Sequence, residues 1–325
     1  MLLNLVFVLL GLAGLYIGGE WLVTGSSRVA LAFRVSPMFI GLTIVAIGTS
    51  VPELVVSLLA ALDGSPGLAL GNVVGSNIAN IGLILGLTGT IHVLSVNESL
   101  VKREIPIMIF VTLIASGLAL DGKFDRLDGL ILLAGFVFFT GVFYYFARES
   151  GSSDEDMLAD LDLPDPDSGG KLAINRPMEF GRILIGSLIL IVGARLMVTG
   201  ARNVAEAIGV SELVIGVTIV AFGTSLPELA TSLTAAFKGE NDIAIGNVIG
   251  SNIANLLLVL GATSVTRPIN IGQTDLSIVE YVVMIGFALA MLPFARNKEL
   301  SRFESAVFLG AYIAFILYSF LLSSG

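Results

Sequence analysis

Residues 41–86 read GLTIVAIGTSVPELVVSLLAALDGSPGLALGNVVGSNIANIGLILG, and residues 216–261 read GVTIVAFGTSLPELATSLTAAFKGENDIAIGNVIGSNIANLLLVLG. Aligned without a gap at an offset of 175 residues, the two stretches are identical at 29 of 46 positions. Apolar composition alone does not produce such agreement, so the chain contains an internal repeat. The match extends upstream at the same offset, where Val23-Thr24-Gly25 aligns with Val198-Thr199-Gly200. Two copies of one structural unit are therefore predicted.

The composition around the repeat is that of a membrane protein. Of 325 residues, 55% are hydrophobic and 13% are charged, about half the charged share of a soluble domain. With 17 Lys and Arg against 26 Asp and Glu, no basic surface for nucleic acid is expected. The chain has no Cys and a single His, which excludes disulfides, thiol catalysis and His-based metal clusters. No nucleophile–base pair or cofactor motif is present, so neither an enzyme nor a bound cofactor is predicted.

Ten stretches approach the length of about 20 apolar residues that a membrane-crossing helix requires. They are 2–18, 38–62, 68–91, 104–121, 128–147, 179–199, 212–237, 242–264, 276–295 and 302–322. The first lacks a basic leader and a cleavage site, so we expect a retained helix. Each repeat unit spans five helices, and this odd number places the second unit upside down in the membrane. The predicted fold class is an all-α polytopic membrane protein with ten transmembrane helices in two inverted five-helix repeats, as in secondary transporters.

An acidic segment separates the two halves. Residues 149–170 contain eight acidic residues and no basic one, a composition that does not form a packed core. We predict a first repeat over 1–148, an acidic flexible cytoplasmic linker over 149–176, and a second, inverted repeat over 177–325. With the N-terminus outside, Lys and Arg divide 12 inside to 5 outside, so both termini are predicted outside. The expected setting is the lipid bilayer of the plasma membrane, and the expected functional form is a monomer.

Each repeat places one carboxylate deep inside a span. Glu53 and Glu228 occupy equivalent positions, about 15 residues from the start of their spans. A carboxylate in the membrane interior is costly unless it faces a wet cavity or a cation. Two such residues at matching positions therefore indicate a cation site, in preference to a Glu pair bonded internally for packing.

A proline precedes each of these glutamates, at Pro52 and Pro227. Proline cannot donate a main-chain hydrogen bond and clashes with the carbonyl four residues back, so the helices are predicted to break near Gly48 and Gly223. Main-chain carbonyls from Ala46 to Gly48 and from Ala221 to Gly223 are expected to lose their partners there. Hydroxyl oxygens are added at the same breaks by Thr49, Ser50, Thr224 and Ser225. A proline kink capped by these hydroxyls is the structural alternative.

The following helix of each half carries a polar stripe with a spacing of four residues. The stripes are Asn72, Ser76 and Asn80 in one half, and Asn247, Ser251 and Asn255 in the other. Polar residues of this kind also join helices, but two stripes beside two glutamates favour a role in the site. All these ligands are hard oxygen donors, which suit Ca²⁺ and Na⁺ and argue against Zn²⁺ and Cu⁺. Two negative charges balance one Ca²⁺ or two Na⁺, and this is a physical basis for antiport.

Two motifs, G-T-S-[VL]-P-E and G-N-V-[VI]-G-S-N-I-A-N, each occur twice. They resemble the α-repeats of the sodium/calcium exchanger family, and the resemblance covers the whole chain in helix count and repeat layout. It implies that ions are ligated by Glu53, Glu228, Thr49, Ser50, Thr224, Ser225, Ser76, Ser251, Asn80, Asn255 and the carbonyls of Ala46 and Ala221. One departure is Asn255, because some relatives, including potassium-dependent ones, have Asp there. The resemblance also implies alternating access, in which the glycine-rich first and sixth helices slide against the rest.

The function predicted from these observations is Na⁺/Ca²⁺ antiport, with Ca²⁺ and Na⁺ as substrates. An H⁺-coupled exchanger of Ca²⁺ or another divalent cation is the first alternative, and it requires the two glutamates to titrate during transport. A cation channel is the least favoured interpretation, because broken helices duplicated in two halves are typical of transporters.

Overall fold

In the computed structural model, the described residues are 2–33, 35–149, 175–208, 221–274 and 277–323. The first half contains α1 (Leu2–Phe33), α2 (Pro37–Ile40), η1 (Gly41–Val45), α3 (Ala46–Thr49), α4 (Val51–Leu62), α5 (Pro66–Ala79), η2 (Asn80–Leu85), α6 (Gly86–Ile91), β1 (Leu94–Ser95), η3 (Leu100–Glu104), α7 (Ile105–Leu118), η4 (Ala119–Asp121), β2 (Lys123–Phe124) and α8 (Arg126–Glu149). The second half contains α10 (Arg176–Ala207), α12 (Ala221–Gly223), α13 (Leu226–Phe237), α14 (Asn241–Ala254), η7 (Asn255–Val259), α15 (Leu260–Thr266), β3 (Ile269–Asn270), η8 (Ile271–Gln273), α16 (Ile278–Phe294), η9 (Ala295–Asn297), β4 (Glu299–Leu300) and α17 (Arg302–Ser323).

The predicted spans correspond to apolar helices of the structure. Within the described part of the chain, eight helices are long and apolar enough to cross a membrane, and Pro37–Thr49 with Val51–Leu62 forms a ninth span bent by 42°. The remaining predicted span, 212–237, begins outside the described residues and continues as α12 and α13. The predicted linker, 149–176, also lies almost wholly outside the described residues.

The first and sixth spans are much longer than predicted. Helices α1 and α10 each have 32 residues, about 48 Å at 1.5 Å per residue, whereas the apolar pattern predicted 2–18 and 179–199. The apolar pattern ends where charged residues begin, but the helices continue because those charges are paired. Glu20 binds Lys238, and Arg28 binds Glu179. The prediction of span ends from hydropathy was therefore wrong at these two helices.

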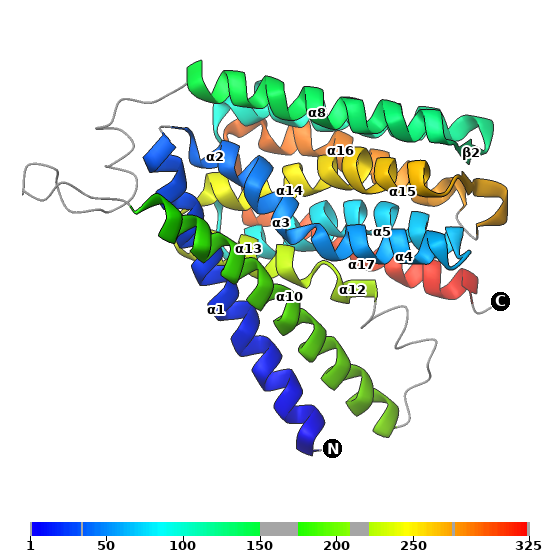
Figure 1. Cartoon of the computed structure of the whole chain (residues 1–325), viewed down its shortest axis with the longest axis horizontal. Helices are drawn as coiled ribbons and strands as arrows, with labels where there is room; N and C mark the ends of the chain where they lie inside the picture. The colour runs from blue at the N-terminus through cyan, green and yellow to red at the C-terminus, as the bar shows by residue number, and fades with distance from the viewer. Residues whose placement is uncertain (1, 34, 150–174, 209–220, 275–276, 324–325) are drawn as a thin grey trace, which may run out of the picture.

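Helices α1 and α10 pack directly against each other and cross one side of the molecule diagonally (Figure 1). Their contact depends on glycine, because a Cβ at Gly18 would lie 2.8 Å from the carbonyl oxygen of Gly186. A Cβ at Gly186 would in turn lie 2.8 Å from the main-chain nitrogen of Leu22. Small residues thus bring the two backbones into contact, as in other membrane helix pairs.

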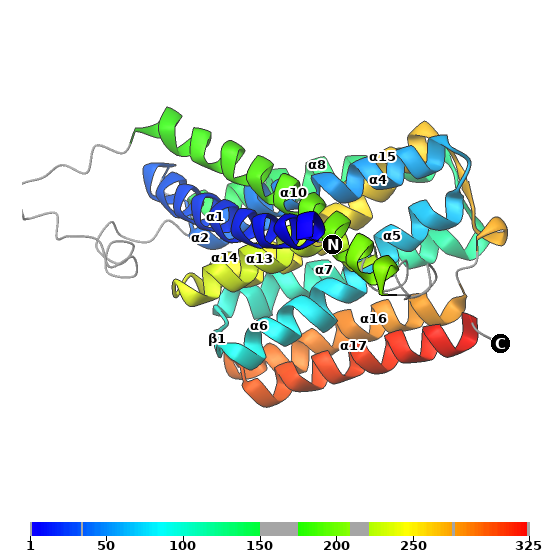
Figure 2. The same cartoon turned by 90° about the horizontal axis from the view of Figure 1, so that it is seen from below.

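Two short strand pairs show that the second half is inverted. β1 follows the third span of the first half and pairs with β4, while its counterpart β3, 175 residues later, pairs with β2. β1 and β2 lie at opposite ends of the molecule (Figures 1 and 2). Equivalent strands of the two halves are therefore at opposite ends. The fold is an all-α polytopic membrane fold with ten transmembrane helices in two inverted five-helix repeats.

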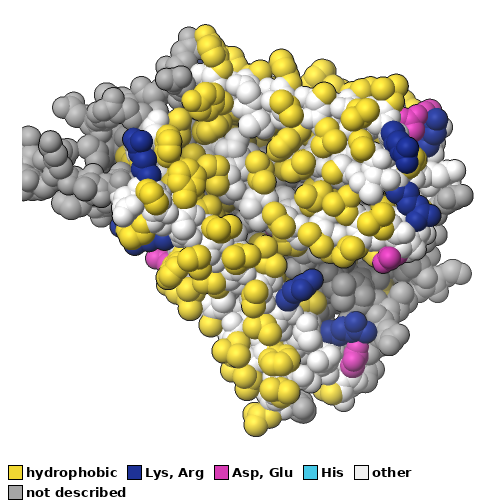
Figure 3. Space-filling model, viewed as in Figure 1, with side chains coloured by type: hydrophobic (Ala, Val, Ile, Leu, Met, Phe, Trp, Pro, Cys, Tyr) yellow, Lys and Arg dark blue, Asp and Glu magenta, His cyan; other side chains and the backbone are white. Residues whose placement is uncertain are grey.

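The helices that carry the repeated motifs occupy the centre of the bundle. In the most apolar window, 94% of residues are buried for Asn241–Thr266 and 72% for Pro66–Ile91, against 11% for Arg302–Leu321. The outer helices present apolar side chains over a broad surface, with Lys, Arg, Asp and Glu confined mostly to its margins (Figure 3). The polar motif residues are thus removed from the lipid-facing surface.

Candidate cation site

Glu53 and Glu228 lie in the first turns of α4 and α13, and each is only 1% exposed. The positive end of each helix dipole favours a carboxylate at this position. Among the described residues, no hydrogen-bond partner reaches either carboxylate oxygen of Glu53 or Oε2 of Glu228. A buried carboxylate without a partner requires a compensating positive charge, so this position is suited to bind cations.

The chain breaks at Ser50 and Ser225, two residues beyond the predicted breaks at Gly48 and Gly223. The two serines have φ/ψ of −83°/5° and −87°/6°, which are not helical. The new helices begin directly after them because proline is well tolerated in the first turn of a helix. The predicted kink is present in each half, but its position was wrong by two residues.

The carbonyl of Ala46 does not lose its partners at the break. It accepts a hydrogen bond from the main-chain N–H of Ser50 at 3.0 Å and one from the hydroxyl of Thr49 at 3.3 Å. The expectation that this carbonyl is freed by the proline was therefore wrong, because the helix continues to Thr49 before it breaks. In the second half, Ala221 begins the short helix α12.

The main chain at each glutamate is held by an asparagine from the neighbouring helix. Asn72 Nδ2 donates to the carbonyl oxygen of Glu53 at 3.1 Å and to Ser57 Oγ at 2.9 Å. Asn247 Nδ2 donates in the same way to the carbonyl oxygen of Glu228 at 3.3 Å and to a serine hydroxyl at 3.1 Å. The two halves therefore build the same support for their glutamates.

The hydroxyl groups at the breaks reach across to the opposite repeat. Thr49 Oγ1 donates to Asn247 Oδ1 at 3.1 Å, and Ser50 Oγ donates to Glu228 Oε1 at 3.4 Å. The reciprocal contact runs from Thr224 Oγ1 to Asn72 Oδ1 at 3.5 Å. These cross-repeat bonds merge the two sets of ligands into one central site.

Asn80 and Asn255 each begin a π-helical turn, a local widening of the helix that is frequent at functional sites. Asn80 Nδ2 donates to Asn252 Oδ1 at 3.0 Å, which leaves Asn80 Oδ1 without a partner. Asn255 is fully buried, and neither its Oδ1 nor its Nδ2 has a partner among the described residues. Two buried amide oxygens are thus available to a ligand.

The remaining predicted ligands have similar surroundings. Ser76, Ser225 and Ser251 are buried, and Ser251 Oγ lies 3.5 Å from Thr49 Oγ1. Among the described residues, no group of three or more acidic, His or Cys residues forms a metal cluster. The site therefore combines two carboxylates with neutral hydroxyl and amide oxygens, a ligand set suited to Ca²⁺ and Na⁺.

Sequence reasoning did not identify Ser57 and Ser232. Each accepts the supporting asparagine amide and donates to a main-chain oxygen, that of Ala69 at 3.2 Å or that of Ala244 at 3.4 Å. The available signal was their identity at the repeat offset. Asn77, which was expected to bond across helices, instead binds Val73 O of its own helix at 2.8 Å.

Inverted repeats, helices broken at the centre of the bundle and a buried site of oxygen ligands define a secondary transporter of cations. The family described as sodium/calcium exchanger protein matches residues 3–145 and 178–321. The sodium/calcium exchanger MaX1 of Methanosarcina acetivorans is 32% identical over 345 residues, with 98% of each chain covered. A putative antiporter, CaxA of Alkalimonas amylolytica, is 38% identical over 329 residues, with 100% of each chain covered.

Solved structures give the same result. The sodium-calcium exchanger NCX_Mj, soaked with 2.5 mM Na⁺ and 0.1 mM Ca²⁺, superposes with a TM-score of 0.81 at 35% identity, covering 98% of each chain. The chain belongs to the sodium/calcium exchanger family. It is a membrane transporter and not an enzyme, and its ions are cargo and not cofactors.

Proposed function

We propose that this protein exchanges Na⁺ for Ca²⁺ by alternating access, with Glu53 and Glu228 as the central ligands. The observation that carries the proposal is the pair of buried carboxylates with three unpartnered oxygens, set among neutral oxygens from both repeats. The charge of −2 is balanced by one Ca²⁺ or by two Na⁺, so the same oxygens serve either ion in turn. The named sodium/calcium exchangers among the relatives support Na⁺ as the coupling ion.

The flanking ligands of the proposed site come equally from both repeats. They are Thr49, Ser50, Ser76, Asn80 and the Ala46 carbonyl from one half, and Thr224, Ser225, Ser251, Asn255 and the Ala221 carbonyl from the other. The proposed working unit is one chain, organised as 1–148 and 177–325 with the acidic 149–176 as a tether, because the site is built within a single chain.

The proposed location is the plasma membrane, with both termini outside. The end of the molecule that carries β1, β4 and the start of α10 has nine described basic residues, which are Arg28, Lys102, Arg103, Arg176, Arg182, Lys238, Arg296, Lys298 and Arg302. The end with β2 and β3, together with the adjoining half of α10, has five, which are Lys123, Arg126, Arg195, Arg202 and Arg267. The positive-inside rule assigns the more basic end to the cytoplasm.

The test is Ca²⁺ uptake into proteoliposomes loaded with Na⁺ and diluted into Na⁺-free buffer. Vesicles loaded with choline, and vesicles with an imposed pH gradient, are the ionic controls. Glu53→Gln and Glu228→Gln preserve side-chain shape and remove one charge each, and Glu299→Gln at an exposed position is the matched control. We expect uptake only with internal Na⁺, abolished in both site variants and retained in the control.

Other outcomes would assign a different function. Uptake driven by the pH gradient without Na⁺ would establish the H⁺-coupled alternative. Uptake that depends on neither gradient would contradict antiport and support a channel.

A further inference from the structure

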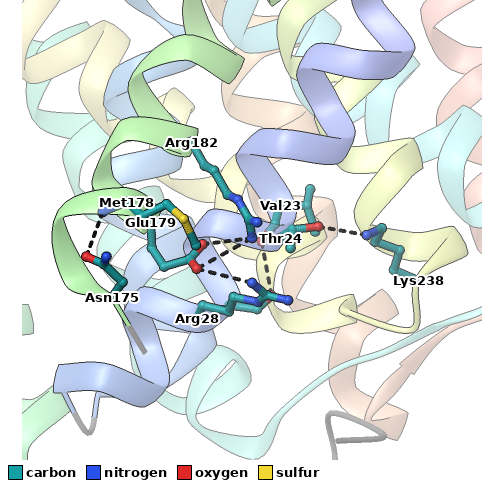
Figure 4. A network of polar contacts seen from close by, with 9 residues as sticks. Val23, Thr24, Arg28, Asn175, Met178, Glu179, Arg182 and Lys238 are labelled. Carbon is teal, nitrogen blue, oxygen red and sulfur yellow. Dashed lines mark hydrogen bonds and ion pairs between the residues drawn. The ribbon is translucent and has the colours of Figure 1, made fainter. Parts of the chain in front are cut away.

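The two repeats place opposite charges at equivalent positions near the ends of α1 and α10. At the offset of 175 residues, Glu20 corresponds to Arg195 and Lys238 corresponds to Asp63. Lys238 Nζ lies 2.8 Å from Glu20 Oε1, and this contact is called the first pair. Lys238 also donates to Thr24 Oγ1 at 2.9 Å, which ties the turn after α13 to α1 (Figure 4).

Arg195 and Asp63, called the second pair, are exposed, and no ion pair between them is found in the described part of the chain. The repeat has therefore kept a complementary pair at both ends with its signs reversed. Only one of the two pairs is formed in this structure.

Burial of the adjoining helices has the same asymmetry. α1 packs against α13 so closely that a Cβ at Gly19 would lie 2.9 Å from Thr234 Oγ1. Leu226 and Thr234 on this face of α13 are 4% and 9% exposed. Their counterparts on α4, Val51 and Leu59, are 38% and 55% exposed. The face that α1 covers in one half is thus open in the other.

α1 and α10 are joined so that they can move as one body. Besides their glycine contact, Glu179 at the start of α10 is 1% exposed and lies between two arginines (Figure 4). It is 3.1 Å from Arg28 of α1 and 3.1 Å from Arg182 of its own helix. Exchange of the two end conformations by the repeat symmetry would carry α10 onto the open face of α4. The same movement separates Glu20 from Lys238 and brings Arg195 to Asp63.

We propose that the first pair and the second pair form alternately, one in each of the two access states of the transporter. This inference rests on the alternating access of the proposed function. The reversed signs also oppose a mixed arrangement, because Glu20 and Asp63 repel each other, as do Lys238 and Arg195. Exposed ion pairs are weak, which suits a device that biases two nearly balanced states without locking either. Arg267, which donates to Leu62 O at 2.7 Å, is the neighbouring cation on the Asp63 side.

Cross-linking tests the proposal, because the chain has no Cys of its own. One variant carries Glu20→Cys and Lys238→Cys, and the other carries Asp63→Cys and Arg195→Cys. Both are treated in proteoliposomes with a short, reducible, homobifunctional thiol reagent. We expect both to be linked within the chain, although only the first pair is in contact here. Linking is expected to stop ion exchange in both, and reduction to restore it.

The charge dependence separates this device from simple flexibility. In the Asp63→Cys/Arg195→Cys variant, added Lys238→Gln breaks the first pair and is expected to raise the initial linking rate about two- to fivefold. Added Lys238→Arg retains the charge and is expected to leave the rate unchanged, as is Lys298→Gln, an exposed lysine at the same end.

Two results would overturn the proposal. One is failure of positions 63 and 195 to link when positions 20 and 238 link in a protein with a monodisperse elution profile. The other is a linking rate that does not respond to Lys238→Gln. Neither readout depends on which ion drives transport, so failure of Na⁺ coupling and failure of the paired device are distinguished.

Discussion

Asn72 donates its side-chain amide to the main-chain oxygen of Glu53 at 3.1 Å, and so holds the first turn of α4 from the neighbouring helix. The equivalent bond from Asn247 to Glu228 is 3.3 Å long. Each glutamate is thus positioned through its main chain, while its carboxylate is left for the cargo. A site built this way separates support from ligation, and the two roles respond differently to mutation.

Asn247→Ala is expected to destabilise the protein more than Asn72→Ala. Asn247 is fully buried, whereas Asn72 is half-buried. Its removal leaves Glu228 O and a serine hydroxyl without their donor, at a cost of about 1–3 kcal/mol. At Asn72 water can replace part of the loss. Thermal unfolding in detergent measures both, and equal midpoints for the two variants would contradict the expectation.

Asn80→Ala and Asn255→Ala are expected to differ in the opposite sense. Asn80 binds Asn252, so its removal leaves a buried acceptor unpaired and lowers stability by about 1–3 kcal/mol. Asn255 has no protein partner among the described residues, so its removal should weaken Ca²⁺ binding and leave the ion-free protein nearly as stable. Unfolding midpoints with and without Ca²⁺ distinguish the two. A large loss of ion-free stability in Asn255→Ala would refute this separation.

Gly193→Ala is expected to disrupt the contact of α1 with α10. A Cβ there would lie 2.9 Å from the main-chain nitrogen of Leu15 and 3.0 Å from the carbonyl oxygen of Gly11, and overpacking of this kind costs about 1–3 kcal/mol. Gly181→Ala on the same helix is the control, because a Cβ at Gly181 meets nothing within 4 Å. Exchange rate and unfolding midpoint should fall only in Gly193→Ala.

Stability should depend on the charge of Glu98, which lies outside the membrane spans. Hydrogen bonds and ion pairs with Lys102 and Lys298 lower the pKa of Glu98 from 4.5 to about 2. Because the pKa is lower in the folded state, the stabilisation is present above about pH 4.5 and is lost as the pH falls towards 2. Glu98→Gln should therefore unfold at a lower temperature than the parent at pH 6, and the difference should shrink as the pH approaches 2. A difference independent of pH would exclude this linkage.

The repeat made most of the fold predictable, because inversion follows from two similar units with an odd number of helices each. The ends of α1 and α10 were not predictable from hydropathy, since Glu20 and Arg28 look like span boundaries until their partners are known. Those partners, Lys238 and Glu179, are more than 150 residues away in the chain.

The candidate ligands were also recognisable from sequence, because carboxylates and amides are costly within apolar spans unless they bind a ligand or one another. The state of the Ala46 carbonyl was not, since it depends on whether the helix ends at Gly48 or at Thr49. Proline restricts a range of positions without selecting one. Whether the predicted residues ligate ions stays a prediction.

The two strand pairs have a consequence for the origin of this architecture. β1 and β3 are the same strand of the repeat, as are β2 and β4, so the β1–β4 and β2–β3 contacts are one contact made twice. A single five-helix unit that paired with an inverted copy of itself would form both contacts as a two-fold symmetric, self-complementary interface. Such a unit would have to insert into the membrane in both orientations, and fusion of two copies would remove that requirement while allowing Glu20 and Arg195 to diverge.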